Sequence, residues 1–367
     1  MNENIPNTMK ALVLTGPGEF DIQEAPVPSA GPSEVLCRIR AVAICGTDPE
    51  IIRGGFPGFW PPSYPFIAGH EWAGEVVAVG ENAVGFDIGD RVAGEAWKGC
   101  GLCDNCVAGN YNLCQNYGRL ETGMRHYGFR CQGAYAQYNA YSVKSIHKMA
   151  DNVSYQEGSM VDTVGPGMHC IDMMGITTGG TVVVIGPGPI GLLTMQTARI
   201  RGASKVIVVG RGARLEAAGR LGADILIDFE KEDPVQAVRA ATGGMGVHEA
   251  FECSGAPGTF VQAVMMVREG GRVGLLGVPD ESVREPVPYK HICRSEIAIF
   301  GVKANPNVAA RILKLIASGQ MVVKDLITHV FPLNEFDTAL DTFVNRRDGA
   351  IKVIIEPNGS EAAGEEV

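Results

Sequence analysis

The sequence lacks a surplus of positive charge. Its 367 residues contain 31 Lys and Arg against 41 Asp and Glu, which gives a formal net charge of -10. Proteins that bind nucleic acid neutralise its phosphates with a basic face or stripe. The charge balance therefore argues against nucleic acid as the main partner.

Long apolar runs are missing as well. No segment has the roughly 20 consecutive apolar residues that a helix needs to cross a bilayer. Residues 1–10 also lack the basic and then apolar order of a secretory signal. We therefore expect a cytoplasmic protein with no membrane partner. The composition, 46% apolar and 20% charged, is that of an ordinary globular chain, and the length fits two domains.

The ten cysteines need an explanation, because a large cytoplasmic chain rarely uses them for disulfides. Four of them form the most specific motif in the chain, Cys100-x-x-Cys103-x-x-Cys106 followed by Cys114. Four thiolates from one short loop can close a tetrahedral shell around zinc with no position left open, which is a structural site. Disulfides are the rival interpretation, but cysteines this close in sequence make strained bridges. The spacing predicts a zinc lobe over about residues 97–116.

A second set of metal-ligand types lies nearer the N-terminus. Cys45 begins the segment Cys-Gly-Thr-Asp, and His70 and Glu71 follow about two dozen residues later. A catalytic zinc takes three protein groups of these kinds and leaves one position for water or substrate. Asp162 is a carboxylate in an otherwise apolar stretch, where a metal would offset the cost of burying it. Singly, each residue also fits an ordinary structural role.

Other conspicuous residues have two interpretations. Phe56, Phe59 and Trp60 lie in a Gly/Pro-rich loop, which is either a packed surface loop or an aromatic wall over the metal. His169 and Cys170 follow Asp162 on an expected helix, and we interpret both as core or capping residues.

The middle of the chain has a different pattern. Residues 181–185 are typical of a buried parallel strand, and residues 192–201 of an amphipathic helix. Between them lies a glycine turn whose backbone N–H groups can hold a pyrophosphate. Its residues are Gly186, Pro187, Gly188, Pro189, Ile190 and Gly191. Strand and helix patterns then alternate to about residue 300, which predicts a doubly wound sheet of six parallel strands.

The remaining segments predict little function. Residues 9–14 are expected to form a first strand, and residues 20–94 show the short alternating runs of a compact β-rich domain. The tail from Pro357, rich in Gly, Ser and Glu, is expected to be disordered.

Together these motifs resemble the zinc-dependent medium-chain alcohol and polyol dehydrogenase family, which includes sorbitol, threonine and secondary-alcohol dehydrogenases. The Cys-Gly-Thr-Asp and Gly-His-Glu segments, the four-cysteine lobe and the dinucleotide turn occur in family order and spacing. The resemblance implies an α/β protein with a GroES-like β-rich catalytic domain over residues 1–165. A Rossmann domain would follow over residues 166–304, and residues 305–367 would return to the catalytic domain.

The resemblance also implies roles for the metal-site residues. Cys45 and His70 would bind the catalytic zinc, Asp162 would supply the third protein ligand, and Glu71 would bind or exchange with water. The Thr47 hydroxyl would relay the substrate's proton, although it can also be a simple turn hydroxyl. Many relatives place His two residues after the Asp of this motif, where this chain has Glu50, so Glu50 is our candidate for the outer relay.

Cofactor choice depends on the end of the second Rossmann strand. NAD-specific relatives carry Asp or Glu there, whose carboxylate binds the ribose 2′-hydroxyl and repels a 2′-phosphate. This chain has Gly210 at that position, with Arg211 and Arg214 close behind as planar cations suited to a phosphate. We therefore favour NADP over NAD, with solvated surface arginines as the alternative.

These inferences predict a zinc-dependent oxidoreductase that transfers a hydride between a nicotinamide cofactor and a secondary alcohol, polyol or amino alcohol and its ketone. We expect two zinc ions per chain and a homodimer or homotetramer as the assembly. Two other classes remain open. One is a zinc-independent reductase of the same superfamily, which typically lacks the four-cysteine lobe and the Gly-His-Glu triplet. The other is a non-catalytic dinucleotide-binding sensor, which would have no need of Thr47 beside metal ligands.

Overall fold

A computed structural model describes residues 5–280 and 282–359. The chain divides into two compact units. Unit 1 runs to Asp162 and also takes in Pro306–Gly319 and the chain from Val323 onward, whereas unit 2 comprises Thr163–Asn305 and Gln320–Val322. The tail expected to be disordered falls mostly on residues 360–367, which lie outside the described residues.

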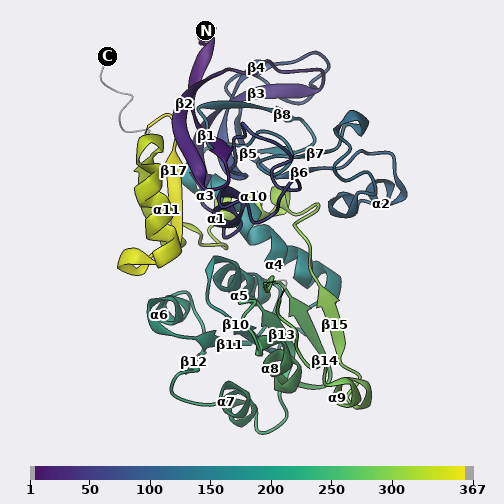
Figure 1. Cartoon of the computed structure of the whole chain (residues 1–367). Coiled ribbons are helices and arrows are strands. Elements are labelled where there is room, and N and C mark those ends of the chain that lie inside the picture. Colours follow the sequence, from purple (N-terminus) through teal and green to yellow (C-terminus); the bar gives the residue numbers. More distant parts are fainter. Residues whose placement is uncertain (1–4, 281, 360–367) are drawn as a thin grey trace. The chain divides into compact units, whose positions relative to one another are not determined.

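Unit 1 is built on a seven-stranded sheet with the order β16-β17-β3-β4-β5-β9, in which β8 also pairs with β3 (Figure 1). Most neighbours are antiparallel, but β16 and β17 are parallel, so the end of the chain supplies strands to a sheet begun by the first domain. Two smaller pairs are β1-β2 and β6-β7. The strands are β1 (Thr8–Gly16), β2 (Glu19–Pro26), β3 (Glu34–Ala43), β4 (Glu71–Val79), β5 (Arg91–Gly94), β6 (Trp97–Lys98), β7 (Arg125–His126), β8 (Tyr138–Ser142), β9 (Ile146–Lys148), β16 (Ile327–Pro332) and β17 (Lys352–Glu356).

The helices of unit 1 are short. They are α1 (Asp48–Ile52), α2 (Asp104–Val107), α3 (Tyr155–Ser159), α10 (Ala309–Ala317) and α11 (Phe336–Asn345), with single turns η1 (Tyr111–Leu113), η2 (Leu120–Thr122), η3 (Lys324–Leu326), η4 (Leu333–Glu335) and η5 (Arg347–Gly349). Helix α3 begins with a complete capping box, because Ser154 and Glu157 each accept a hydrogen bond from the other's backbone N–H. It packs on β3, β4 and β5.

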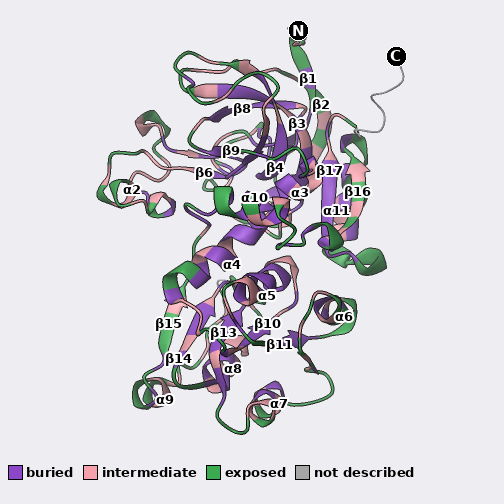
Figure 2. Cartoon of the chain, turned by 180° about the vertical axis from the view of Figure 1, so that it is seen from behind, coloured by how far each residue is buried: buried purple, intermediate pink, exposed green. Residues whose placement is uncertain are grey.

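Unit 2 is a six-stranded parallel sheet with the order β12-β11-β10-β13-β14-β15, which confirms the expected doubly wound architecture (Figure 1). The central strands are buried, as expected for a parallel sheet covered on both faces (Figure 2). The strands are β10 (Thr181–Ile185), β11 (Lys205–Gly210), β12 (Ile225–Asp228), β13 (Val247–Glu252), β14 (Val267–Leu275) and β15 (Ala298–Gly301). The helices are α4 (Val161–Met174), which starts at the last residues of unit 1, α5 (Pro189–Ile200), α6 (Gly212–Arg220), α7 (Pro234–Ala241), α8 (Thr259–Met266) and α9 (Tyr289–Arg294).

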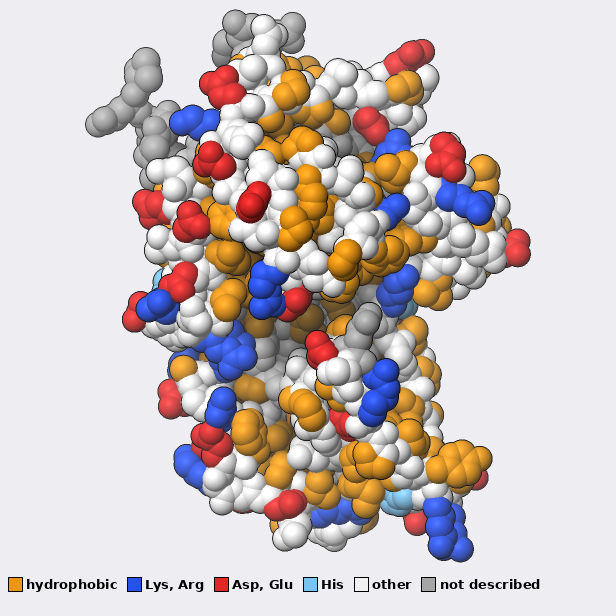
Figure 3. All heavy atoms as spheres, viewed as in Figure 1, with side chains coloured by type: hydrophobic (Ala, Val, Ile, Leu, Met, Phe, Trp, Pro, Cys, Tyr) orange, Lys and Arg blue, Asp and Glu red, His pale blue; other side chains and the backbone are white. Residues whose placement is uncertain are grey.

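Two expectations about surfaces can be compared with the structure. Within the described residues, every helix is too short or too polar to pass through a bilayer. On the face drawn in Figure 3, Lys and Arg side chains are interspersed with Asp and Glu.

Cys170 is fully buried with its Sγ 3.4 Å from Met174 Sδ, so it packs in the core as expected.

Candidate metal and cofactor sites

The sheet of unit 1 brings three metal-ligand types together at one strand end. Strands β3 and β4 pair with Ala43 opposite Glu71, so Cys45, just past the end of β3, meets His70, just before β4. One ligand atom from each of Cys45, His70 and Glu71 lies within 4.8 Å of the other two. His70 and Glu71 are each only 3% exposed. The donors are those of a zinc site.

Asp48 organises this cluster from behind. Its Oδ2 accepts hydrogen bonds from the Cys45 backbone N–H and the Tyr135 hydroxyl, both at 2.8 Å. Its Oδ1 lies 3.6 Å from His70 Nδ1, an ionic contact too long for a hydrogen bond. This leaves His70 Nε2 for a metal, with the carboxylate orienting the ring as outer-shell carboxylates do.

The charges around His70 favour a cation. Burial alone would lower the pKa of the His70 imidazole, but the Cys45 thiolate and the Asp48 carboxylate raise that pKa well above its ordinary value. The negative charges of Cys45 and Asp48 that hold a proton on the His70 imidazole would equally favour a metal cation in its place. The donor set and its electrostatics therefore both fit zinc.

Glu71 has a cationic partner from the far end of the chain. Lys352, the first residue of β17, forms an ion pair through Nζ with Glu71 Oε2, and the two side chains are only 2% and 4% exposed. Removing one member of such a buried pair leaves an uncompensated charge and typically costs about 3–5 kcal/mol. Lys352 thus permits a third acidic group beside Cys45 and Asp48.

The two proposed relay residues lie in different environments. The Thr47 hydroxyl donates to Cys45 Sγ at 3.3 Å, so it lies directly at a candidate ligand. Glu50, on α1, forms an ion pair with Arg53 at its i+3 position, and the Glu50 side chain is 48% exposed. The structure therefore places Thr47 at the cluster and Glu50 toward solvent.

Asp162 is the one expected ligand outside the compact cluster. It begins α4, is half-buried, and is close enough to Tyr111 to contribute to the raised pKa of that hydroxyl, after burial and Glu95. The group whose ligand atoms lie within 4.8 Å of one another consists of Cys45, His70 and Glu71.

The four-cysteine motif forms a second cluster. One Sγ from each of Cys100, Cys103, Cys106 and Cys114 lies within 4.8 Å of the others, and all four thiols are free of disulfides. The Cys100 and Cys106 sulfurs are 3.9 Å apart. Tetrahedral zinc with bonds of about 2.3 Å separates its sulfurs by about 3.8 Å, so the spacing fits a metal.

The lobe is held by polar contacts, because Asn105 Nδ2 donates to the Leu113 carbonyl oxygen at 2.6 Å and Asn307 Nδ2 donates to the Gly109 carbonyl oxygen at 2.8 Å. Leu102 and Val107 are 81% and 75% exposed, and α2 has no buried residue. The pKa of the Cys100 thiol is lowered to about 6, because the Asn116 side-chain amide and the Leu102 and Cys103 backbone N–H groups donate to its sulfur. Burial raises the pKa of Cys106 to about 12. A bound metal ion would remove that penalty and link the four sulfurs.

The glycine turn of unit 2 is shaped for close approach. Gly186 has φ +93°, and a Cβ there would lie 2.7 Å from Ser254 Cβ. A Cβ on Gly191 would lie 2.0 Å from the Gly186 carbonyl oxygen. A Cβ on Gly188, the N-cap of α5, would make only an ordinary contact with Arg214 Nη1 at 3.9 Å, and Pro189 and Ile190 form the first turn. The structure thus leaves the helix start accessible to a pyrophosphate.

The end of β11 has a steric feature that the sequence alone did not reveal. A Cβ on Gly210 would lie 2.3 Å from Pro187 Cγ, so an acidic side chain cannot be placed there without movement. Arg211 pairs with Glu230 and lies 5.7 Å over the Phe229 ring. Arg214 Nη1 lies 3.9 Å from the Cβ position of Gly188, so this guanidinium stands beside the glycine turn.

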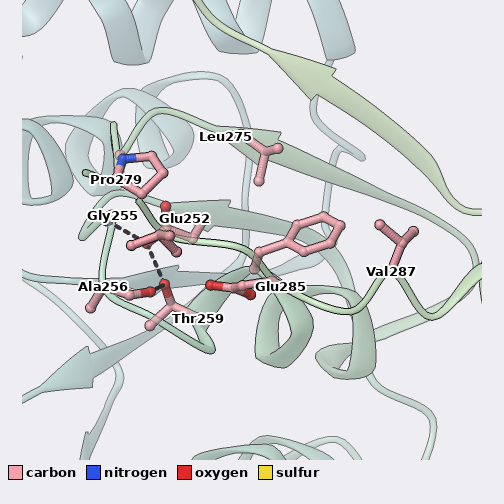
Figure 4. Close-up of a pocket in the computed structure, with 11 residues that line it drawn as sticks. Glu252, Gly255, Ala256, Thr259, Leu275, Pro279, Glu285 and Val287 are labelled. Atoms are coloured by element: carbon pink, nitrogen blue, oxygen red, sulfur yellow. Dashed lines mark hydrogen bonds between the residues drawn. The ribbon is translucent and has the colours of Figure 1, made fainter. Parts of the chain in front are cut away.

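Unit 2 also has a hollow of about 300 Å³ beyond the carboxyl ends of β13 and β14 (Figure 4). The buried Glu252 ends β13, and its Oε1 accepts hydrogen bonds from the Ser254 and Gly255 backbone and the Thr259 hydroxyl. Glu285 reaches in from the other side and accepts from the Gly258 N–H. These two carboxylates anchor the loops that form the hollow.

Three residues of the metal centre received no individual role from the sequence. Asp48 is only the last residue of the Cys-Gly-Thr-Asp segment, and no motif includes Tyr135. Lys352 had a detectable signal, because it is a single cation within the apolar run Ile351 to Ile355. A charge that must be buried needs a partner, but the sequence does not say which one.

Comparisons with known proteins agree with this geometry. Residues 31–151 match the family model of the alcohol dehydrogenase GroES-like domain, and residues 189–318 match that of the zinc-binding dehydrogenases. Sorbitol dehydrogenase of Bacillus subtilis is 32% identical over 359 residues, covering 98% of this chain and 100% of that protein. L-threonine 3-dehydrogenase of Symbiobacterium thermophilum is 32% identical, covering 96% of this chain and 98% of its own.

Solved structures show the same fold. A zinc-binding dehydrogenase from Sinorhizobium meliloti, bound to NADP, superposes with a TM-score of 0.87 at 31% identity and covers 96% of this chain and 100% of its own. An alcohol dehydrogenase from E. coli CFT073, complexed with NADH, gives a TM-score of 0.87 at 27% identity over 96% of this chain and 100% of its own. The chain belongs to the zinc-dependent medium-chain alcohol and polyol dehydrogenase family. It is a nicotinamide-dependent oxidoreductase of the alcohol dehydrogenase type.

Proposed function

We propose that the protein transfers a hydride between NADP(H) and a secondary alcohol, polyol or amino alcohol and its ketone, using one catalytic and one structural zinc ion per chain. The observation that carries this proposal is the buried cluster of Cys45, His70 and Glu71. Bound zinc lowers the pKa of a substrate hydroxyl, and the nicotinamide accepts the hydride.

The chain's own residues hold and orient the reacting groups. Cys45 and His70 would hold the metal, and Asp48 orients the His70 ring through its contact with Nδ1. Thr47 Oγ1, already at Cys45 Sγ, receives the proton of the substrate hydroxyl and passes it outward. Glu50 is the outer acceptor in this scheme. Thr47→Ser should retain most of kcat and Thr47→Val should lose roughly 10²- to 10⁴-fold, the usual contribution of a positioned acid–base group.

The remaining protein ligand is a carboxylate. Asp162 is our assignment for the working enzyme, with Glu71 binding or exchanging with water, although Glu71 lies in the compact cluster. Asp162→Asn and Glu71→Gln separate the two roles. The variant that loses catalytic zinc under dialysis identifies the permanent ligand, and loss of zinc only from Glu71→Gln would contradict the assignment of Asp162.

The direct test is metal analysis together with a substrate panel. Purified protein should contain two zinc ions per chain and should oxidise alcohols with one of the nicotinamide cofactors. Fewer than about one zinc per chain removes the central claim. Full activity after exhaustive removal of metal would favour the zinc-independent reductase, and tight cofactor binding without turnover would favour the sensor.

The preference for NADP is supported by the end of β11. Gly210 lacks the carboxylate of NAD-specific relatives, and Pro187 occupies the space that such a side chain would need. Arg214 supplies a cation beside the glycine turn, and Arg211 supplies another directly after Gly210. The Arg211–Glu230 pair is more than half exposed, so a phosphate can compete for Arg211 at little cost.

Substitution tests this preference. Arg211→Ala should weaken NADP(H) binding about ten- to hundredfold, the effect of losing a charged hydrogen bond of roughly 1.5–3 kcal/mol, and should change NAD(H) binding little. Glu230→Gln is the matched control and should strengthen NADP(H) binding, because it removes a competing anion. Unchanged NADP(H) affinity in Arg211→Ala and Arg214→Ala alike, or a wild type that prefers NAD(H), would show that the assignment is wrong.

The assembly remains part of the proposal. We infer a homodimer or homotetramer from the family resemblance, and sedimentation of the zinc-loaded protein should give a mass of about two or four chains. A monomer would contradict this part without affecting the metal assignment.

A further inference from the structure

A series of ring contacts leads from His70 to the surface of unit 1. The centroids of His70 and Phe129 are 4.5 Å apart, those of Phe129 and Trp60 are 4.9 Å apart, and those of Trp60 and Phe59 are 5.0 Å apart. Exposure rises along the series, from 6% at Phe129 to 47% at Phe59, with Trp60 half-buried. We call Phe59, Trp60 and Phe129 the aromatic wall.

The aromatic wall is fixed from several sides. The His126 ring stacks on Phe129 at 3.8 Å and on Trp97 at 3.9 Å, which supports the inner end. At the outer end, Arg130 Nη1 donates to the Phe59 carbonyl oxygen at 2.9 Å. A surface held in this way loses little side-chain entropy when it binds a ligand.

The polar atoms around the wall bond to one another. Trp60 Nε1–H donates to the Tyr117 hydroxyl oxygen at 2.6 Å, and that hydroxyl shares a 2.8 Å hydrogen bond with His126 Nδ1. The single N–H donor of Trp60 and the single O–H of Tyr117 are therefore used within the protein when His126 accepts at Nδ1. Trp60 and Phe129 therefore present ring carbon, and at the outer end the Arg130 guanidinium carbon lies 5.8 Å from the centroid of the Phe59 ring.

A polyol substituent and an apolar substituent are expected to bind to the aromatic wall with different free energies. Each hydroxyl that leaves water and faces carbon without a partner weakens binding. An aromatic or alkyl group instead gains from burial and from offset or edge contacts with the rings. The wall thus favours one branch of the broad substrate class given above.

Resting on the proposed function, we propose that the substrate is a secondary alcohol, or its ketone, whose substituent is apolar and preferably aromatic, and that the aromatic wall binds this substituent. A polyol is then a poor substrate, in contrast to what the name of the Bacillus subtilis relative indicates for that protein.

The first experiment compares three alcohols with the zinc-loaded enzyme and its preferred cofactor. The ratio of kcat/KM for 4-phenyl-2-butanol to that for sorbitol should be about 100 or more, since several hydroxyls lose partners in the second case. The ratio of 4-phenyl-2-butanol to 2-butanol should be about 10 or more. If 2-butanol is oxidised but the phenyl compound is no better, or if sorbitol is preferred, the inference is overturned and the dehydrogenase assignment stands. If no alcohol is oxidised, the proposed function itself fails.

The second experiment tests whether the aromatic wall causes the preference for the phenyl-substituted alcohol. Phe59→Ala should lower the ratio of kcat/KM for 4-phenyl-2-butanol to that for 2-butanol about tenfold, whereas Phe59→Leu, which keeps apolar bulk, should lower it no more than about threefold. Phe86→Ala is the matched control, because Phe86 is a partly exposed phenylalanine of unit 1 that packs near Lys148. An unchanged ratio in both Phe59 variants, or an equal fall in the control, would show that the wall does not bind the substituent.

A binding measurement gives the same answer without turnover. Titration with 4-phenyl-2-butanone should quench tryptophan fluorescence in the wild type and quench it less in Trp60→Phe, which leaves Trp72 and Trp97 in place. Equal quenching in the two proteins would contradict contact between the substituent and Trp60.

Discussion

The two candidate metal clusters of unit 1 bring their residues together in different ways. The four cysteines of the lobe all lie within residues 100–114. The apolar side chains of Leu102 and Val107 are exposed, and no residue of α2 is buried. The Cys45 centre takes its ligands from two strand ends and surrounds them with Asp48 and Lys352, which are 0% and 2% exposed. The candidate ligands of the lobe therefore come from one local segment, whereas the pairing of two strands brings those of the centre together.

The largest expected difference between the clusters is in activity. Cys45→Ala and His70→Ala should lower kcat by roughly 10³-fold or more and leave the melting temperature close to that of the wild type, because they remove a metal ligand from a centre that β3 and β4 still hold. Cys103→Ala should instead lower the melting temperature by several degrees and release the structural zinc. Calorimetry and zinc analysis of the variants would check both. A Cys45 variant that unfolds, or a Cys103 variant as stable as the wild type, would break the comparison.

The next largest effect concerns the buried pair of the centre. Lys352→Met should destabilise the protein by about 3–5 kcal/mol, because the buried Glu71 side chain would lose its cationic partner. Denaturant unfolding measures this loss. Adding Glu71→Gln to Lys352→Met should recover a large part of it, and a double variant no more stable than the single one would show that Lys352 acts by packing alone.

A pH experiment sharpens the contrast in the lobe. With zinc removed, Cys100 should react with iodoacetamide with a midpoint near pH 6, because its lowered pKa keeps the thiolate above that pH. Cys106, whose pKa is raised to about 12, should stay unreactive through neutral pH. Since the Cys100 pKa is lowered on folding, its contribution to stability is fully present above pH 9 and is lost as the pH falls through about 6. Peptide mass spectrometry reads the sites, and equal modification of both thiols at pH 7 would contradict this prediction.

The smallest expected effect is that of Tyr135→Phe. It removes one hydrogen bond to Asp48 Oδ2, while the Cys45 backbone N–H still donates to the same oxygen. The expected loss is about 1–1.5 kcal/mol of stability, with zinc content unchanged. Loss of zinc from this variant would mean that the Asp48 environment controls binding more strongly than the ligands' positions indicate.

The features that the sequence could predict are those whose residues lie close together in the chain. The lobe was predictable as a whole, because its four ligands lie within one short segment whose spacing is itself the signal. The strands of unit 2 were predictable for a similar reason, since each is a local apolar run next to a helix pattern. The ligand types Cys45, His70 and Glu71 were visible, and their convergence followed from the family resemblance.

The parts that the sequence did not predict depend on distant contacts. Nothing near Lys352 in the sequence identifies Glu71 as its partner, and nothing near Pro187 indicates that its ring fills the space beside Gly210. The stack of Trp97, His126 and Phe129 joins segments that have no common pattern. Asp162 differs from these cases. The sequence predicted it as a ligand, whereas the compact cluster consists of Cys45, His70 and Glu71.

The pairing of Lys352 with Glu71 gives the centre an order of assembly in time. A ribosome delivers Cys45, His70 and Glu71 about 280 residues before Lys352. At about 5–20 residues per second, the growing chain spends roughly 15–55 seconds with these ligands made and their ammonium partner not yet synthesised. A metal ion that arrives in this interval meets Glu71 without a competing cation, whereas one that arrives after release meets Glu71 already neutralised.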